Sequence, residues 1–268
     1  MPVERVHWEV TDHLLHELAP RQHKYVVLIP VLNEGARIRR QMEKMKGLAG
    51  CVDLAIIDGG SRDGSVELEV LRQTGVRALA VKTGPGRLSA QLRIGLAWAM
   101  DEGYAGAILI DGNDKDDSSA VPLFIAALEE GYDHLQGSRF IRGGAEVNTP
   151  LSRHLAVKFI HAPTISLAAR FRYTDTTNGF RAYSRRFLLH ESVQPFRNVF
   201  NAYELHYYLA IRAARLRFRV KEIPVTRSYP LGDIPTKIKG WRGNMAILRT
   251  LLAACLGRFD PPEKPCAP

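Results

Sequence analysis

Strand-like and helix-like segments alternate through the first half of the chain, and this alternation constrains the fold more than any other feature of the sequence. Short apolar runs between turn residues are typical of strands that are covered on both faces of a sheet. Such runs occupy residues 25–32, 52–57, 77–81 and 105–110. Apolar residues at helical spacing fill the intervals, at 38–45, 66–71 and 88–99. Strands joined by crossover helices predict an α/β fold with a mostly parallel sheet flanked by helices.

The second half of the chain is less regular. Residues 151–172 combine apolar with basic side chains and contain Pro163, which predicts two short basic amphipathic helices. The remaining predictions are a helix at 201–214, a strand at 216–220 and a helix at 236–256. A helical stripe with Leu and Trp most often packs in the core. For the helix at 236–256, the sequence leaves open whether this stripe packs in the core, on lipid or on a partner subunit.

The 268-residue chain carries a formal net charge of +9, which first suggests a nucleic-acid-binding surface. The charge is unevenly distributed, because residues 1–136 hold 15 Lys and Arg against 20 Asp and Glu, whereas 137–258 hold 21 against 6. This asymmetry indicates one acidic half and one half that binds something anionic. Neither aromatic residues interleaved with cations nor a helix-turn-helix is evident, so we expect no nucleic acid as a partner.

Cysteine usage and the two ends of the chain predict a cytoplasmic location. Three scattered cysteines suit neither a disulfide framework nor a thiolate zinc site, which favours a reducing compartment. Charged residues interrupt the N-terminus, unlike the apolar core of a signal peptide. The apolar run at 251–256 is shorter than the roughly 20 residues that a membrane span needs. We therefore expect a chain that neither spans a membrane nor is secreted by that route.

Polar loops follow the predicted strands, at the edge where parallel sheets bind ligands. The first loop contains Pro30, Asn33 and Glu34, and the second begins with Asp58. A carboxylate at a strand end suits hydrogen bonds to a ribose or a base. The alternative is that Asp58 caps a turn and that Glu34 interacts with a helix dipole.

The third and fourth loops suit a diphosphate. Residues 82–87 offer two glycines and a cation before a helix, without a Walker A or Rossmann signature. Residues 111–117 include four carboxylates, which repel one another unless a cation shares them. A hard divalent ion bridging to a diphosphate would resolve that repulsion. The alternative is a solvated acidic turn that caps the next helix.

Taken together and in this order, the four loops resemble family-two glycosyltransferases of the GT-A fold. Motifs of the second half are similar to the polyprenyl-phosphate (dolichol-phosphate) mannosyl- and glucosyltransferase branch, at 137–140 (GSRF), 175–183 (DTTNGFRAY), 203–204 (YE) and 222–225 (EIPV). The resemblance covers about residues 25–239. It implies an N-terminal arm (1–24), a GT-A catalytic domain (25–240), and a C-terminal helix with a Pro-rich tail (241–268). The catalytic domain would comprise a nucleotide-sugar half (25–136) and an acceptor half with acceptor-side helices (137–240).

The resemblance implies a UDP- or GDP-sugar donor and a Mg²⁺ or Mn²⁺ ion on its diphosphate. The residues expected around the donor are Pro30, Asn33, Glu34, Asp58, Gly84, Arg87, Arg181, Arg227 and Lys237. The metal ligands expected are Asp111, Asn113 and Asp114. The family usually has a second Asp at position 113 and often Gln at 115, and a protonated Lys115 cannot ligate a metal. Either Asp114 or Asp116 serves as a ligand, or Lys115 supplies part of the charge of the metal.

The resemblance also implies inversion by a single displacement at the anomeric carbon. Charge then develops on the leaving diphosphate, so positioned cations lower the barrier. The resemblance places Arg139, Arg153, Arg181 and Arg227 near the acceptor or donor phosphates. A phosphate acceptor needs no base, whereas a hydroxyl acceptor needs a carboxylate, for which Asp175 and Glu204 are the candidates. The expected catalytic residues are Asp111, Asp175, Glu204 and Arg139. The sequence lacks the Gln-x-x-Arg-Trp signature of processive members, which favours an anionic acceptor such as polyprenyl phosphate.

The basic segment at 151–172 suits a membrane surface, where each Lys or Arg near anionic lipid contributes about 1 kcal/mol. It predicts a peripheral contact with the inner face of the membrane. The alternative is an enzyme for a soluble hydroxyl acceptor in polysaccharide or natural-product biosynthesis. Further alternatives are a sugar-phosphate nucleotidyltransferase, which would carry a Gly-rich signature where Asn33 and Glu34 stand, and a nucleic-acid-binding protein. The oligomeric state is left open.

Overall fold

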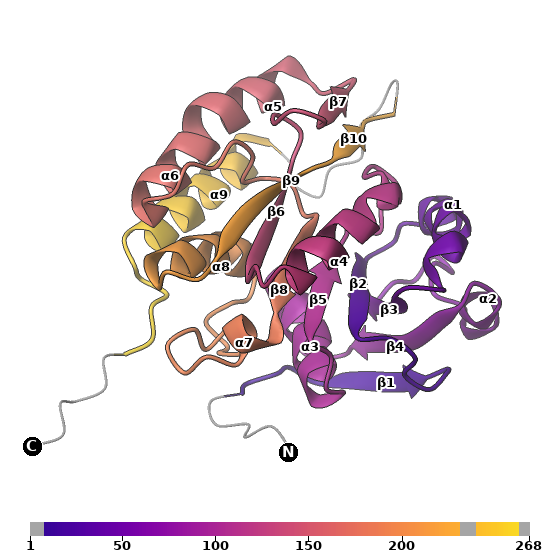
Figure 1. Cartoon of the computed structure of the whole chain (residues 1–268). Coiled ribbons are helices and arrows are strands. Elements are labelled where there is room, and N and C mark those ends of the chain that lie inside the picture. The colour runs from indigo at the N-terminus through magenta and orange to yellow at the C-terminus, as the bar shows by residue number, and fades with distance from the viewer. Residues whose placement is uncertain (1–7, 231–239, 263–268) are drawn as a thin grey trace, which may run out of the picture.

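The computed structural model describes residues 8–230 and 240–262 (Figure 1). Its centre is a sheet with the strand order β1-β4-β3-β2-β5-β8-β6-β9. The parallel strands of the first half are β2 (Tyr25–Val31), β3 (Asp53–Asp58), β4 (Val76–Lys82) and β5 (Gly106–Leu109). In the second half β6 (His134–Ser138) pairs parallel with β9 (Val220–Pro224), and β8 (Arg181–Ser184) lies antiparallel between β5 and β6. This topology confirms the predicted mostly parallel sheet.

Helices cover both faces of the sheet. One face carries α1 (Ala36–Met45), α2 (Leu68–Gln73) and α4 (Val121–Glu129), and the other carries α3 (Leu88–Asp101), α7 (Arg185–Leu188) and α8 (Glu204–Arg215). Short 3-10 turns at Lys46–Leu48 and Ser118–Ala120 adjoin α1 and α4. Val27 and Ile29 of β2 pack on the first face, whereas Val26 and Leu28 pack on the second. Successive strand side chains point to opposite faces, so an uninterrupted apolar run is buried on both.

A third apolar cluster joins the C-terminal helices. Ile165 of α6 (Ala162–Ala169), Tyr207 of α8 and Leu251 of α9 (Gly240–Cys255) are buried together. The predicted helix at 236–256 is therefore α9 within the described residues, and 236–239 lie outside them. One side of α9 is core, which settles part of the question that the sequence left open. None of the described helices is long and apolar enough to cross a membrane.

The basic segment is one continuous helical run, so the predicted break at Pro163 is wrong. α5 (Leu151–Ala156) continues through a π-helical turn (Val157–His161) directly into α6. Pro163 lies in the first turn of α6. A proline is tolerated where the wider π turn has already interrupted the α-helical hydrogen-bond ladder.

The strand predicted at 216–220 is also wrong, because it begins only at Val220. The Phe218 N–H donates to the Ala213 carbonyl (2.9 Å) and the Arg217 N–H donates to the Ala214 carbonyl (3.0 Å). Arg217 has a φ of 61°, so these bonds form the left-handed ending of α8. The alternation of apolar and basic residues at this point belongs to a helix terminus rather than to a strand.

The N-terminal arm contributes a strand that the sequence did not predict. β1 (His13–Glu17) pairs antiparallel with β4 at the edge of the sheet. Before it, Trp8 packs on Phe196 with ring centroids 4.2 Å apart. The first part of the chain therefore crosses over to the second half and then closes one edge of the sheet (Figure 1).

Candidate active site

The loops after β2, β3 and β5 are joined by hydrogen bonds at the carboxyl edge of the sheet. The Gly112 N–H donates to the Pro30 carbonyl (3.2 Å), which connects the loop after β5 to the end of β2. The Asn33 N–H donates to Ser61 Oγ (2.8 Å), and the Asn33 side-chain oxygen accepts from the Arg62 N–H (2.9 Å). The three loops therefore lie together, where ligands bind in sheets of this kind.

The two carboxylates expected near the nucleoside both have partners within the protein. Asp58 is buried, and its Oδ2 accepts the N–H groups of Gly60 and Ser61 at 2.8 Å each. Glu34 pairs with Arg37 at 2.7 Å between Oε2 and Nη2. These contacts favour a role in fixing the loops, and direct contact of Asp58 and Glu34 with a donor stays a prediction.

The glycine loop after β4 is covered by the N-terminal arm. The Gly84 N–H donates to the Asp12 carbonyl (2.9 Å), and a Cβ on Gly84 would lie 2.3 Å from Thr11 Oγ1. The Arg87 N–H donates to the Asn201 carbonyl (2.7 Å). The backbone N–H groups of Gly84 and Arg87 are thus used within the fold, the first by the N-terminal arm and the second by Asn201, and neither contact was anticipated.

Asp111 lies on the loop after β5, with its side chain 26% exposed. Its Oδ2 accepts from Arg227 Nη2 (3.1 Å), and Asn113 Nδ2 lies 3.5 Å from the same oxygen. A Cβ on Gly179 would lie 2.5 Å from Asp111 Oδ1. The absence of a side chain at Gly179 therefore allows the backbone of the Asp175–Phe180 segment to approach the carboxylate.

Two other carboxylates of this loop, Asp114 and Asp116, are each paired with a cation. Asp114 adopts a left-handed φ of 57° and pairs with Lys44 of α1 at 2.7 Å. Asp116 is buried and pairs with Arg227 Nη1 at 2.5 Å. The structure thus brings Asp111 and Asn113 together but directs Asp114 to α1, and its role as a metal ligand stays a prediction.

Arg227 connects the loop after β5 to a strand of the second half of the chain. It lies on β10 (Thr226–Ser228), which pairs parallel with β7 (Ala145–Val147) and also bridges to Asp116. Burial would lower the pKa of Arg227, but Asp116 and Asp111 outweigh burial and raise it. Burial raises the pKa of Asp116 to about 6, against the opposing effect of Arg227. The guanidinium therefore stays charged and holds two carboxylates at the sheet edge.

Three cations surround the ring of Tyr229, and we call these four residues the Tyr229 cluster. Lys115 Nζ lies 5.3 Å from the ring centroid, and the guanidinium carbons of Arg153 and Arg227 lie at 5.3 and 5.8 Å. Arg153 Nη1 also donates to the Tyr229 hydroxyl (3.0 Å). Burial would raise the pKa of Tyr229, but Arg227 and Arg153 lower it. Sequence reasoning missed Tyr229, which directly follows β10; its spacing of two from Arg227 was the available signal.

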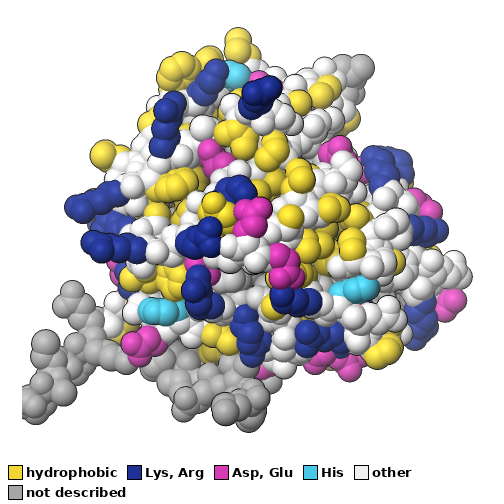
Figure 2. All heavy atoms as spheres, in the orientation of Figure 1, with side chains coloured by type: hydrophobic (Ala, Val, Ile, Leu, Met, Phe, Trp, Pro, Cys, Tyr) yellow, Lys and Arg dark blue, Asp and Glu magenta, His cyan; other side chains and the backbone are white. Residues whose placement is uncertain are grey.

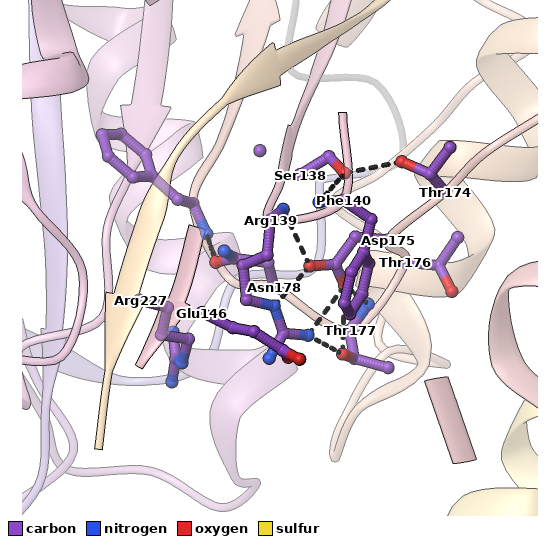
Figure 3. A network of polar contacts seen from close by, with 12 residues as sticks. Ser138, Arg139, Phe140, Glu146, Thr174, Asp175, Thr176, Thr177, Asn178 and Arg227 are labelled. Atoms are coloured by element: carbon purple, nitrogen blue, oxygen red, sulfur yellow. Dashed lines mark hydrogen bonds and ion pairs between the residues drawn. The ribbon is translucent and has the colours of Figure 1, made fainter. Parts of the chain in front are cut away.

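Arg139 and Asp175 form a buried ion pair (Figure 3). Arg139 Nε and Nη2 donate to the two oxygens of Asp175 at 2.6 and 3.0 Å, and Nη2 also donates to Thr177 Oγ1 at 3.1 Å. Glu222 accepts the backbone N–H groups of Thr174 and Asp175 at 2.7 and 3.1 Å. With both oxygens bound to a guanidinium and no exposed surface, Asp175 is placed to orient Arg139 rather than to accept a proton.

Arg181 and Glu204 serve the framework around the site. Arg181 is buried and donates to the carbonyls of Thr176, Asn178 and His206 at 2.7, 3.0 and 2.7 Å. Its Nε and both terminal nitrogens thereby bind backbone, which favours a structural role over phosphate binding. Glu204 begins α8 and accepts the Ala202 N–H at 2.6 Å. Lys237 falls outside the described residues.

A buried histidine beside Arg181 predicts acid sensitivity. Burial, and then Arg181, lower the pKa of His134 to about 3. The unfolded chain, with an ordinary histidine pKa near 6.5, therefore binds one more proton between those values, and stability falls as pH drops below about 6.5. We expect a loss of about 1.4 kcal/mol per pH unit from this group near pH 5. Chemical denaturation at pH 7 and pH 5 measures the free energy of unfolding at each pH. The difference between the two values should be smaller in His134→Phe than in the unchanged chain. An equal difference would contradict the assignment of acid sensitivity to His134.

Among the described residues, no group of three or more His, Cys, Asp or Glu side chains is placed to hold a metal ion. The Asp111 carboxylate is 26% exposed, and the Asn113 amide adjoins it, with Nδ2 facing Asp111 and Oδ1 accepting the Lys115 N–H at 3.3 Å. Mg²⁺ is commonly held by one or two carboxylates together with substrate phosphates and water. The donor set fits a metal that arrives with the diphosphate better than a metal bound by protein alone.

Comparisons with known proteins identify relatives of the chain. The model of glycosyl transferase family 2 matches residues 26–194. The chain is 26% identical over 209 residues to polyprenol monophosphomannose synthase of Mycolicibacterium smegmatis, covering 75% of this chain and 76% of that protein. It is 30% identical over 149 residues to dolichyl-phosphate hexose transferase of Haloferax volcanii, covering 56% and 60%.

A solved structure shares the fold. Glucosyl-3-phosphoglycerate synthase from Mycobacterium tuberculosis, in complex with Mn²⁺, UDP and glucosyl-3-phosphoglycerate, matches with a TM-score of 0.62 at 18% identity. The match covers 88% of this chain and 80% of that one. It confirms the predicted mixed α/β architecture.

Proposed function

The chain belongs to glycosyl transferase family 2, and on that basis we propose that it transfers a hexose from a UDP- or GDP-sugar to polyprenyl phosphate. The Tyr229 cluster beside Asp111 carries this proposal, because it gathers cations at the sheet edge where the two substrates would meet. The names of the two relatives above, which concern polyprenol and dolichyl phosphates, support the same acceptor class.

The carboxylates of the site favour an acceptor that is already an anion. Asp175 is bound to Arg139, and Asp116 is bound to Arg227, with neither side chain exposed. Glu204 accepts a backbone N–H at the start of α8. A hydroxyl acceptor would need a free base, whereas a phosphate oxygen is itself the nucleophile. These placements therefore support the phosphate acceptor over the hydroxyl alternative.

In the proposed reaction an oxygen of the acceptor phosphate attacks the anomeric carbon as the bond to the donor diphosphate breaks, which inverts that carbon. Arg153 and Arg227 would orient the acceptor phosphate through charge-assisted hydrogen bonds. Asp111 and Asn113 would hold a Mg²⁺ or Mn²⁺ ion, which when bound neutralises charge on the leaving diphosphate. Asp116 keeps the Arg227 guanidinium in place.

An assay with separate donors and acceptors tests this function. The purified chain is incubated with UDP-glucose or GDP-mannose, and with polyprenyl phosphate in detergent or with phosphoglyceric acid in solution. We expect a lipid-linked hexose phosphate from one of the donors. Product from phosphoglyceric acid alone would favour the soluble hydroxyl acceptor instead, and no product from any pair would contradict the proposal.

We further propose that the helical run α5–α6 lies on the inner face of the cytoplasmic membrane. Its exposed apolar side chains are Leu151, Leu155, Phe159, Ile160 and Leu167, with Leu167 84% exposed. Hydrophobic and basic side chains gather together along the top of the molecule, over α5 and α6 (Figure 2). An apolar row flanked by cations suits the interface of an anionic bilayer. Such a surface lies next to Arg153, where a lipid phosphate would enter.

Binding to phospholipid vesicles tests the proposed membrane contact of α5 and α6. Phe159→Glu and Leu167→Glu should each weaken sedimentation with anionic phospholipid vesicles by roughly tenfold or more, because burying such a side chain contributes about 1.5–3 kcal/mol. Leu123→Glu on α4, where Leu123 is 48% exposed, is the matched control and should bind as the unchanged chain does. Equal binding by all four proteins would contradict the membrane contact.

A further inference from the structure

β1 forms one edge of the central sheet, and its outer side is open in the described part of the chain. It is the last strand in the sheet order, next to β4, and Figure 1 shows no described helix or strand beyond it. Leu14 and Leu15 are 57% and 43% exposed, on opposite faces of the strand. Natural edge strands are usually protected by lysines, prolines or bulges, because their unpaired backbone groups bind other strands. The segment His13–Glu17 contains neither Lys nor Pro, and its register with β4 is uninterrupted.

The hydrogen bonds to β4 show which residues of β1 direct their backbone groups outward. The Thr83 N–H donates to the Asp12 carbonyl (2.9 Å) and the Leu18 N–H donates to the Arg77 carbonyl (2.7 Å), at the two ends of the ladder. In an antiparallel ladder, residues that bond to the neighbouring strand alternate with residues whose N–H and C=O point away from it. The residues of β1 that point these groups away from β4 are therefore His13, Leu15 and Glu17.

This open edge is complementary to a second copy of itself. In antiparallel pairing about a two-fold axis at Leu15, Leu15 lies opposite Leu15 of the second copy, and His13 lies opposite Glu17. All the outward backbone groups of these three residues then have partners. An axis at His13 or at Glu17 would instead place that ionisable side chain opposite its own copy, which is unfavourable. The residues of the edge therefore favour one register.

The side chains at this register also complement one another. The two copies of Leu15 form an apolar pair at the axis, and on the other face Leu14 lies opposite His16. The Glu17 side chain is 54% exposed and lies 3.7 Å from Arg77, so it faces a single protein cation at long range. A protonated His13 would meet this carboxylate across the junction. No like charges face each other.

We propose that β1 is a docking edge for a second copy of this chain, which continues the sheet by antiparallel pairing across a two-fold axis at Leu15. Such an interface uses the same patch on both copies, as two-fold dimers do. A five-residue edge is short for an interface, because stable complexes bury roughly 1,200–2,000 Å², so the dimer forms reversibly. Pairing would also restrain the arm before β1, where Thr11 Oγ1 donates to the Pro85 carbonyl (3.2 Å) in the loop after β4.

Sedimentation velocity of the full chain, over about a hundredfold range of concentration, tests the association. The dimer fraction should rise with concentration. Leu15→Lys should weaken the dimer by at least about tenfold, because it places two ammonium groups at the axis. Leu123→Lys on α4, at a leucine that is 48% exposed, is the matched control and should dimerise as the unchanged chain does. Thermal unfolding of both variants shows that they remain folded.

A cysteine pair tests the register. The Cα atoms of the Leu15 pair would lie about 5.5 Å apart, within the roughly 4.4–6.8 Å that a disulfide spans. Oxidation of Leu15→Cys should therefore give a covalent dimer. Leu14→Cys, which would lie opposite His16, should give no more than the unchanged chain, whose own cysteines set the background.

Three results would overturn the docking edge. They are a chain that stays monomeric at every concentration, a Leu15→Lys variant that dimerises as strongly as the unchanged chain, and equal cross-linking of the two cysteine variants. A dimer that is formed through the apolar side chains of α5 and α6 would give the second result. None of these measurements uses a nucleotide sugar or a lipid, so their outcome is independent of the proposed function.

Discussion

Asp111→Asn is expected to lower kcat about 10²–10³-fold, the usual cost of removing one group that stabilises charge in a transition state. The carboxylate lies at the sheet edge, is 26% exposed and faces Arg227 at 3.1 Å, and in the proposed mechanism it holds the metal ion on the donor diphosphate. The amide keeps the shape and removes the charge. Turnover with the donor and acceptor that the assay above selects is the measurement, and full activity would remove Asp111 from the proposed mechanism.

A second variant, Gly179→Ala, is expected to displace the Asp111 carboxylate without replacing it. A Cβ in Gly179→Ala would lie 2.5 Å from Asp111 Oδ1 and 2.9 Å from Cγ, so the side chain of Asp111 must shift. We expect a loss of turnover in the same direction as in Asp111→Asn. Gly47→Ala is the control, because nothing lies within 4 Å of its Cβ. Thermal unfolding of both variants shows whether lost activity reflects lost folding.

Arg139→Leu is expected to lower the free energy of unfolding by about 3–5 kcal/mol, because it leaves the Asp175 carboxylate buried without its partner. The double variant with Asp175→Leu should recover much of that loss, since no unpaired charge remains. Denaturant unfolding of the two single variants and the double variant gives the interaction energy. Equal losses in Arg139→Leu and the double variant would contradict this account of the pair.

An exposed arginine provides the comparison for this pair. Arg39, whose side chain is 51% exposed, pairs with Glu67, which is 60% exposed, at 3.4 Å. Arg39→Leu should lower stability by about 1 kcal/mol or less, because water screens an exposed pair. Asp175→Asn distinguishes a structural role of Asp175 from a catalytic one. We expect this variant to lose turnover only to the extent that it loses folding stability. A folded Asp175→Asn that has lost all turnover would favour Asp175 as a base and a hydroxyl acceptor.

The sequence predicted the strands of the first half because burial on both faces makes them apolar throughout. It also indicated which loops lie at the ligand-binding edge, since the strand ends bearing Asn33, Asp58 and Asp111 follow from the parallel topology. The sequence-based predictions were wrong at two places, where the local residue pattern does not match the structure. The alternation at 216–220 is typical of a strand, yet a left-handed Arg217 ends a helix there. The break expected at Pro163 is absorbed by a π turn.

The roles of individual charged residues were harder to predict. Arg181 and Arg227 are similar as sequence features, but one binds three backbone carbonyls and the other holds two carboxylates. Asp114 and Asp116 are neighbours of Asp111 in sequence, but one faces α1 and the other is buried. A carboxylate or guanidinium is compatible with many partners, so its residue type alone does not select one.

By itself the sequence determined the α/β fold, the order of the loops at the sheet edge and the separation of an acidic from a basic half. These features follow from side-chain periodicity and from residues close together in the chain. Only the tertiary structure decided which charges share the site. Arg227 meets Asp116 and Asp111 across 111 and 116 residues of chain, and the ring of Tyr229 collects cations from three separate elements. Such contacts depend on how β10 and α5 pack against the loop after β5, and short-range electrostatic interactions exist only once that packing has formed.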